Sequence, residues 1–401
     1  MVEINRAEPG LSVVSLFSGG GGLDLGLEAV GFSTLLATDI DAHSCTTLRW
    51  GKEAAEQRRS PFLQHASILQ ADIHDLTSDF ILETIDRKPG EITLLAGGPP
   101  CQAFSVFGKR QGRNDPRGRL VFEYLKILAG LRPQAFVFEN VYGLLTIEDG
   151  KVLEEMLEVL SNPTPGLYYE ISVHRVNAVD YGVPQFRDRV FIVGYIGSER
   201  VTKPSPVVSG QEPTLFLPRR RIVRDAFQGL PELGLLPNHM GRVHSDRIME
   251  RYASLSPGAR DPFTRINKLN LNQPSFTIVV GSDKGGGKGH IHPTESREVT
   301  PRESARIQTF PDWWAFSGTS RHPIRQIGNA VPPLLGAAIG NEIRAQLFGL
   351  EKVKFESILR ALSQEHLFGV NEVDAEIQYH MDQVGSWNEG IVVSPLLARG
   401  S

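Results

Sequence analysis

One of the two cysteines in this 401-residue chain stands where nucleophilic chemistry could occur. Residues 97–105 read Gly-Gly-Pro-Pro-Cys-Gln-Ala-Phe-Ser, and the apolar run 92–96 before them is typical of a buried strand. The prolines stiffen the backbone leading to Cys101, at the carboxyl end of a strand, where α/β sheets bind ligands. A lone cysteine is more often a small core residue, which is our interpretation of Cys45, but the position of Cys101 predicts a presented nucleophile.

The stretch that follows Cys101, up to residue 119, is polar and basic. It is rich in glycine, arginine and asparagine, a composition typical of a surface loop and not of a core. Cations close to a cysteine, such as Lys109 and Arg110, favour the thiolate, which is the reactive form.

A glycine-rich turn marks a second candidate site. Residues 11–17 have the pattern of an apolar strand, residues 18–22 read Ser-Gly-Gly-Gly-Gly, and residues 23–30 have the spacing of an amphipathic helix closed by Gly31. Glycines let the backbone approach a ligand, and the start of a helix offers unpaired N–H groups. A simple tight turn or a dinucleotide-binding fold would also account for this pattern alone.

Acidic residues follow the next two predicted strands. The apolar stretch 34–38 ends at Asp39, and the next one ends near Asp72. Carboxylates at strand ends suit ribose hydroxyls or an amino group. The loop contains no phosphate-gripping lysine and a cysteine follows the next strand, so a dinucleotide enzyme is disfavoured. The pattern favours S-adenosylmethionine as the nucleoside cofactor.

Six sequence blocks in a fixed order carry a resemblance to a known family. The chain resembles the DNA cytosine-5 methyltransferases of bacterial restriction-modification systems over about residues 11–345. This resemblance implies an α/β fold, with a Rossmann-like S-adenosylmethionine-dependent methyltransferase sheet and a smaller irregular target-recognition domain. The blocks are residues 17–22, 99–102, 139–141, 185–189, 302–311 and 326–333.

The resemblance assigns catalytic roles to four residues. Cys101 matches the nucleophile that adds to carbon 6 of cytosine, which activates carbon 5 toward the methyl group. Glu139 matches the acid that hydrogen-bonds or protonates the nitrogen 3 edge of the base. Arg187 and Arg189 match the paired arginines that hold the carbonyl oxygen of the base and help to position the catalytic loop. The base that removes the carbon 5 proton is not identified.

The resemblance also implies a set of cofactor-binding residues. The chain departs from the family at two positions of this pocket: Ser15 stands where the family often has an acid, and Ile40 stands where it often has an aromatic residue. Stacking on the adenine is therefore expected to be weaker. The residues assigned to the cofactor are Phe17, Gly19, Gly20, Gly21, Gly22, Asp39, Ile40, Asp72, Ile73, Gly98, Leu120, Asn329 and Val331.

Charge is distributed unevenly, in a way that predicts a DNA-binding face. The whole chain has a net charge of −4, but residues 200–330 contain 19 Lys and Arg against 11 Asp and Glu. A cytosine inside a duplex cannot reach a buried thiol, so base flipping is implied, with the loop 103–119 as a lid. Solvated turns and a flexible glycine connector are the alternatives for the basic stretches. The expected DNA contacts are Gln102, Ser105, Lys109, Arg110, Arg113, Arg219, Arg220, Arg221, Lys284 and Lys288.

Composition and pattern divide the chain into four parts. We expect a catalytic and cofactor-binding domain at 1–195, a target-recognition domain at 196–295, a return segment that completes the cofactor site at 296–348, and an extension of unknown role at 349–401. No run of about 18 apolar residues and no export pattern occurs, so a cytoplasmic protein without membrane contact is predicted. Two cysteines provide no disulfide framework and no metal cluster.

Three functions fit these observations. Methylation of cytosine in double-stranded DNA is the first, by a monomer that acts separately from a cognate restriction endonuclease. The alternatives are a transfer RNA cytosine-5 methyltransferase and a catalytically inactive DNA-binding member. The long basic segment favours duplex DNA over RNA, and the intact Cys101, Glu139, Arg187 and Arg189 disfavour an inactive member.

Overall fold

A seven-stranded sheet forms the centre of the computed structural model, which describes residues 11–99, 116–278, 289–319 and 321–368. The strand order is β3-β2-β1-β4-β5-β7-β6. The first five strands are parallel, whereas β7 lies antiparallel between β5 and β6. This arrangement confirms the predicted α/β class. The strands are β1 Ser12–Leu16, β2 Ser33–Asp39, β3 Ser67–Gln70, β4 Leu94–Gly97, β5 Ala135–Val141, β6 Glu170–Asn177 and β7 Asp188–Tyr195.

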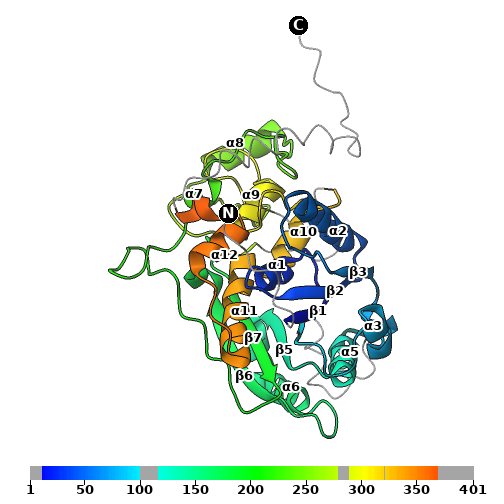
Figure 1. The fold of residues 1–401 in the computed structure, drawn as a ribbon. Coiled ribbons are helices and arrows are strands. Elements are labelled where there is room, and N and C mark those ends of the chain that lie inside the picture. The colour runs from blue at the N-terminus through cyan, green and yellow to red at the C-terminus, as the bar shows by residue number, and fades with distance from the viewer. Residues whose placement is uncertain (1–10, 100–115, 279–288, 320, 369–401) are drawn as a thin grey trace.

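Helices cover both faces of the sheet (Figure 1). One face packs against α1 (Gly22–Glu28), α2 (Ala42–Gln57) and α11 (Pro333–Phe348). The other face packs against α3, α5 and α6. Successive strand residues point to opposite faces, so Val13 joins the first core and Val14 the second. The helices of the second face are α3 Ser78–Thr84, α5 Pro116–Leu131 and α6 Lys151–Ser161.

The chain between β7 and α9 (Pro301–Ile307) has much less regular structure. Its described part contains two short helices, α7 (Val223–Phe227) and α8 (Asp246–Ser254), joined by turns and isolated β-bridges. In Figure 1, α7, α8 and α9 lie at the end of the molecule opposite to β6 and α6. Residues 196–300 include the predicted target-recognition domain 196–295, and we call them the target-reading segment for that prediction.

After α9 the chain returns to the sheet domain through α10 (Arg321–Asn329) and α11. Helix α11 packs closely on α1. A Cβ atom added at Gly26 of α1 would lie only 2.5 Å from the Pro333 carbonyl oxygen of α11. Helix α12 (Phe355–Ala361) and the short 3-10 helix η6 (Glu365–Phe368) then pack together through the edge-to-face rings of Phe355 and Phe368.

The predicted elements and the observed ones differ mainly at their ends. The strand expected at 92–96 is β4 at Leu94–Gly97, and the helix expected at 23–30 is α1 at Gly22–Glu28. The remaining short 3-10 helices are η1 Ile73–Asp75, η3 Tyr142–Leu145, η4 Ile147–Gly150 and η5 Ala178–Tyr181. Within the described ranges no helix has the length and apolar character needed to cross a membrane. In those ranges no three His, Cys, Asp or Glu side chains form a group suited to a metal ion.

Candidate active site and cofactor pocket

The end of β5 brings an acid and an arginine together beside the turn that leads to Cys101. The Glu139 side chain is 12% exposed, and its Oε1 atom forms an ion pair with Arg189 Nε at 2.7 Å. Pairing of Val141 in β5 with Arg189 in β7 creates this proximity. A Cβ atom at Gly98 would lie 2.9 Å from Glu139 Oε2, so glycine is needed for the turn to approach the acid.

A second residue of β5 holds the same turn. The Asn140 side chain is buried, and its Nδ2 donates a hydrogen bond of 2.9 Å to the Pro99 carbonyl oxygen. The backbone two residues before Cys101 is therefore tied to the strand that carries Glu139. Sequence reasoning did not assign a role to Asn140, although it lies inside the block 139–141. Cys101, Gln102, Ser105, Lys109, Arg110 and Arg113 lie outside the described residues.

Arg187 links this acid to the return segment. Its side chain is fully buried, and Nη2 donates hydrogen bonds to the carbonyl oxygens of Gly328 (2.7 Å) and Ala330 (2.9 Å). These carbonyls flank Asn329, one of the residues expected at the cofactor. The Nε and Nη1 atoms of Arg187 are buried and have no hydrogen-bond partner among the described residues. Two donors of this guanidinium are thus available inside the site.

Burial and charge act in opposite directions on these groups. Burial raises the pKa of Glu139, and the guanidiniums of Arg189 and Arg187 only partly offset it. Burial lowers the pKa of Arg187, the neighbouring Arg189 lowers it further, and Glu139 opposes both. The site therefore contains an acid whose protonated form is favoured relative to a solvated glutamate.

Asp39, at the end of β2, organises the first half of the predicted cofactor site. Its Oδ2 accepts a hydrogen bond from the Gly19 N–H and its Oδ1 accepts one from the Asp41 N–H, both at 2.8 Å. The acid thus holds the glycine turn. Phe17, at the start of this turn, has a φ of 57°, a left-handed conformation that is costly for an aromatic residue and typical of functional sites. Ile40, which follows Asp39 in the chain, is 64% exposed.

The glycine turn is packed tightly against the return segment. Trp314 Nε1 donates a hydrogen bond of 2.9 Å to the Gly20 carbonyl oxygen. A Cβ atom at Gly21 would lie 2.8 Å from both Trp314 and Leu48, and one at Gly22 would lie 2.1 Å from the Val331 carbonyl oxygen. These glycines are therefore required for packing as well as for access to a ligand. The sequence contained no local signal for the contact with Trp314, which lies about 300 positions away in the chain.

The other residues expected at the cofactor have mixed environments. Asp72 caps η1, where its Oδ1 accepts a hydrogen bond from the His74 N–H at 3.0 Å and lies 2.6 Å from His74 Nδ1. These contacts lower the pKa of Asp72. Ile73 and Val331 are buried, whereas Asn329, at the end of α10, is exposed. Gly98 lies beside Glu139, as described above, and Leu120 in α5 is half-buried.

The three arginines expected at DNA in the run 219–221 have different surroundings. Arg219 forms a two-bond ion pair with Asp225 of α7, with both distances at 2.9 Å. Arg221 is buried, and its Nη1 donates a hydrogen bond of 2.8 Å to the Leu367 carbonyl oxygen of η6, with the guanidinium 4.2 Å from the Phe368 ring centre. Both arginines thus make contacts within the fold, and their contact with DNA stays a prediction. Arg220 lies over the Phe186 ring.

The two lysines expected at DNA in the glycine run, Lys284 and Lys288, lie outside the described residues.

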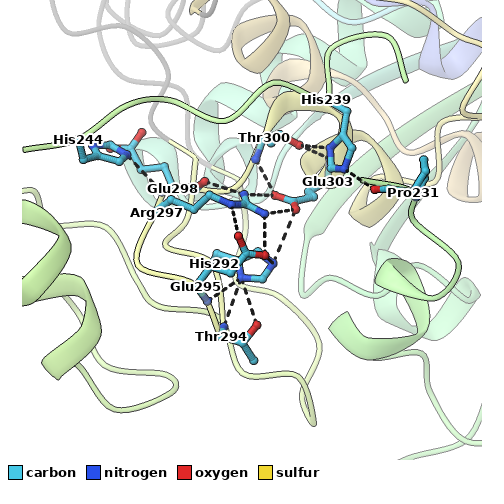
Figure 2. Close-up of polar contacts among 10 residues, drawn as sticks. All are labelled: Pro231, His239, His244, His292, Thr294, Glu295, Arg297, Glu298, Thr300 and Glu303. Atoms are coloured by element: carbon cyan, nitrogen blue, oxygen red, sulfur yellow. Dashed lines mark hydrogen bonds and ion pairs between the residues drawn. The ribbon is translucent and has the colours of Figure 1, made fainter. Parts of the chain in front are cut away.

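A polar group that sequence reasoning missed joins the target-reading segment to α9 (Figure 2). Glu303 is buried in the first turn of α9, and Arg297 donates hydrogen bonds to both of its oxygens at 2.7 and 2.9 Å. His239 Nδ1 lies 2.9 Å from the hydroxyl of Thr300, which caps the helix. His292 Nε2 lies 3.6 Å from Glu303, and burial lowers the pKa of both histidines.

Comparisons with known proteins place this geometry in context. A family model described as C-5 cytosine-specific DNA methylase matches residues 11–345. The type II methyltransferase M.XorII of Xanthomonas oryzae pv. oryzae is 32% identical over 415 residues, covering 91% of this chain and 92% of that protein. M.Sau96I of Staphylococcus aureus is 33% identical over 353 residues, covering 84% of this chain and 76% of that protein.

A solved structure is similar over the same region. It is a DNA modification methyltransferase encoded within a prophage of E. coli, with a TM-score of 0.63 and 28% sequence identity. The match covers 84% of this chain and 99% of that chain.

Proposed function

The chain belongs to the C-5 cytosine-specific DNA methylase family and is a DNA cytosine-5 methyltransferase, and we propose that it modifies one short duplex word by flipping out the target cytosine. The observation that carries this proposal is the buried group of Glu139, Arg189 and Arg187, held against the turn that leads to Cys101. Asn140 supports it by tying that turn to the same strand.

In the proposed reaction the Cys101 thiolate adds to carbon 6 of the cytosine, and a covalent bond forms between sulfur and the ring. The electron pair of the 5,6 double bond becomes available at carbon 5, and negative charge spreads toward nitrogen 3. Glu139 donates a hydrogen bond or its proton at nitrogen 3, a role that suits an acid whose pKa is raised by burial. After methylation, loss of the carbon 5 proton expels the thiolate and restores the ring.

We assign the free guanidinium donors of Arg187 to the carbonyl oxygen of the base. Nε and Nη1 are the buried donors without a partner, while Nη2 is already occupied by the return segment. Donors that are fixed before the reaction stabilise developing charge without a cost of reorganisation. Arg189 then serves mainly to hold Glu139 in place.

We assign S-adenosylmethionine, which supplies the methyl group when bound, to the ends of β1, β2 and β4. Each Asp39 oxygen accepts one backbone hydrogen bond and keeps a lone pair for a ribose hydroxyl. Ile40 offers an exposed apolar side chain to the adenine. Phe17 and the glycine turn border the space for the methionine part, with Asp72, Ile73, Gly98, Leu120, Asn329 and Val331 assigned to the remaining pocket wall.

Duplex DNA is the substrate that the charge pattern supports. Residues 200–330 are basic within an acidic chain, and a site this buried requires extrusion of the base. We further propose that the enzyme acts as a monomer, alongside a separate restriction endonuclease that recognises the same word.

The test is expression in a bacterial host without DNA methylation, followed by bisulfite sequencing of the host DNA. We expect 5-methylcytosine at one recurrent short word from the native chain and none from Cys101→Ser, which should still bind cofactor and DNA. Well-folded native protein that leaves host DNA unmodified would direct attention to RNA substrates. Substantial methylation by Cys101→Ser would overturn the assignment of the nucleophile.

A further inference from the structure

A short hairpin in the target-reading segment has a closely held backbone. Arg260 and Asn267 form an antiparallel bridge, and the Asp261 N–H donates a hydrogen bond of 2.8 Å to the Ile266 carbonyl oxygen. At its base, backbone hydrogen bonds of 2.9 and 2.8 Å join Gly258 to Lys268 and Lys268 to Ala259. We call residues 258–268 the target hairpin.

A buried carboxylate fixes the tip of this hairpin. Asp261 is fully buried, and it accepts hydrogen bonds from the backbone N–H (2.6 Å) and the hydroxyl of Thr264. Arg251 Nε in α8 donates a third hydrogen bond to it at 2.7 Å. Burial raises the pKa of Asp261, but the contacts with Thr264 and Arg251 outweigh burial and the pKa lies below its ordinary value. The tip is therefore held by an ionised group.

Two exposed side chains stand at the tip of the hairpin. Phe263 is 71% exposed, and the guanidinium of Arg251 lies 4.9 Å from the centre of its ring. Arg265 is exposed and has a φ of 65°, a left-handed conformation that costs a non-glycine residue about 1 kcal/mol. Glycine or asparagine would adopt this conformation more easily. This conformation closes the turn, because the Arg265 N–H donates a hydrogen bond of 2.9 Å to the Asp261 carbonyl oxygen, and it leaves the Arg265 side chain exposed at the tip.

Hydrogen bonds connect the target hairpin to the active site. Asn267 and Leu269 pair with Ile291 through two backbone hydrogen bonds of 2.9 Å. Farther along the chain, the Phe186 N–H donates a hydrogen bond of 2.9 Å to the Ser275 carbonyl oxygen, next to Arg187. The hairpin thus projects from a segment whose backbone is hydrogen-bonded to Phe186, next to Arg187.

These observations point to one partner and one role. We propose that the target hairpin enters the major groove of the DNA word and that Arg265 reads a guanine there, with Phe263 in apolar contact with the neighbouring base edge. A two-stranded hairpin fits the major groove, and the planar arginine fork matches the O6 and N7 acceptors of guanine. The inference rests on the proposed function, because it names residues that would choose the word to be methylated.

The test compares substitutions at one position in the full-length protein. Arg265→Gly removes the guanidinium and relieves the left-handed strain, so it should fold at least as well as the native chain. Arg265→Lys keeps the charge without the fork. We expect both to lower kcat/KM on the native word by about 5- to 150-fold, the range typical of one bidentate base contact. Bisulfite sequencing should then show a word relaxed at one G·C pair.

A modified DNA identifies the contact itself. Duplexes with 7-deazaguanine at each guanine of the word lack the N7 acceptor at one position at a time. The native enzyme should lose activity at the position that Arg265 reads, whereas Arg265→Gly should be insensitive there. Arg247→Ala, an exposed arginine of α8 outside the hairpin, is the matched control and should leave the word unchanged.

Three results would overturn the inference, and they are distinct. An unchanged word and kcat/KM in Arg265→Gly would exclude a reading role. Full rescue by Arg265→Lys, with the same word, would indicate a phosphate contact only. Absence of 5-methylcytosine with the native enzyme would remove the proposed function itself, and the inference with it.

Discussion

The sheet domain and the target-reading segment hold their polar groups in different ways. In the sheet domain, Asp39 and Asn140 bond to backbone groups at strand ends, so the register of the sheet determines their positions. In the target-reading segment, arginines hold buried acids, as in Arg297 with Glu303 of α9 and Arg251 with Asp261. Asp39 and Asn140 are thus positioned by backbone groups, whereas Glu303 and Asp261 are each held by an arginine side chain.

This difference has a functional consequence. A site on strand ends tolerates little change, because the glycine turn, Trp314 and Val331 already fill the available space. A segment joined by a few ion pairs can change the residues between those pairs and keep its attachment to the active site. Constant chemistry and variable target reading are thus compatible within one chain.

The largest expected effect lies in the sheet domain. Glu139→Gln removes the acid from the base-binding site, and we expect the methyl-transfer rate constant to fall by about 10²- to 10⁴-fold. Glu295→Gln, at a half-exposed acid of the target-reading segment, should leave the rate nearly unchanged. Single-turnover methylation of a duplex measures both. Equal losses in the two variants would remove the contrast between the regions.

Glycines test the difference in packing. Gly22→Ala places a Cβ atom 2.1 Å from the Val331 carbonyl oxygen, and we expect a loss of about 3 kcal/mol in the free energy of unfolding. Gly258→Ala in the target-reading segment meets no atom within 4 Å, and its φ of 85° should cost about 1 kcal/mol. Urea unfolding compares the variants. A cost at Gly258 that matches the cost at Gly22 would contradict the difference in crowding.

Ion pairs test the comparison in the opposite direction, because here we expect the larger loss of stability in the target-reading segment. Arg297→Met leaves the buried Glu303 carboxylate without its main partner. We expect a loss of about 2 kcal/mol in the free energy of unfolding, less than for a fully buried pair because the Thr300 N–H still donates to Glu303. Lys126→Met breaks a surface pair with Glu123 within α5 of the sheet domain and should cost under about 0.5 kcal/mol. Differential scanning calorimetry measures the loss of stability in both variants. A larger loss in the sheet-domain variant than in Arg297→Met would contradict the prediction.

The smallest effect concerns a buried acid of the sheet domain. Burial raises the pKa of Asp24 to about 6, and the nearby Ser15 hydroxyl only partly offsets it. The folded state therefore binds this proton more tightly than the unfolded state, so Asp24 costs stability as the pH rises from about 4 to about 6. Two pKa units correspond to at most about 2.7 kcal/mol, and relaxation of the surroundings reduces this to about 1 kcal/mol.

Asp24→Asn should remove that dependence. Relative to the native chain, the variant should gain about 1 kcal/mol between pH 4 and pH 7, measured by urea unfolding at several pH values. Glu28→Gln is the matched comparison, because burial raises the pKa of Glu28 to about 7 although it accepts hydrogen bonds from the N–H groups of Thr34 and Leu63, so this variant should gain relative stability over a higher pH range. If the stability of Asp24→Asn and that of the native chain changed with pH in parallel, the raised pKa of Asp24 would be refuted.

Much of the sheet domain was predictable because its signals are local. Apolar runs of strand length ending in a glycine, an acid or a cysteine describe a parallel sheet and its ligand-binding edge within short stretches of sequence. Asp39 could be located in this way, since it directly follows such a run. The resemblance to the family, and no local pattern, supplied the predicted roles of Glu139, Arg187 and Arg189.

Only the tertiary structure decided which polar residues face inward. Arg219 and Arg221 look like DNA contacts in the sequence, yet they bind Asp225 and the Leu367 carbonyl oxygen. The contact of Trp314 with Gly20 joins residues 294 positions apart. The sequence by itself determined the α/β sheet and the family to which the chain belongs. Burial and pairing of the charged side chains depend on which distant elements pack together, and no local pattern contains that information.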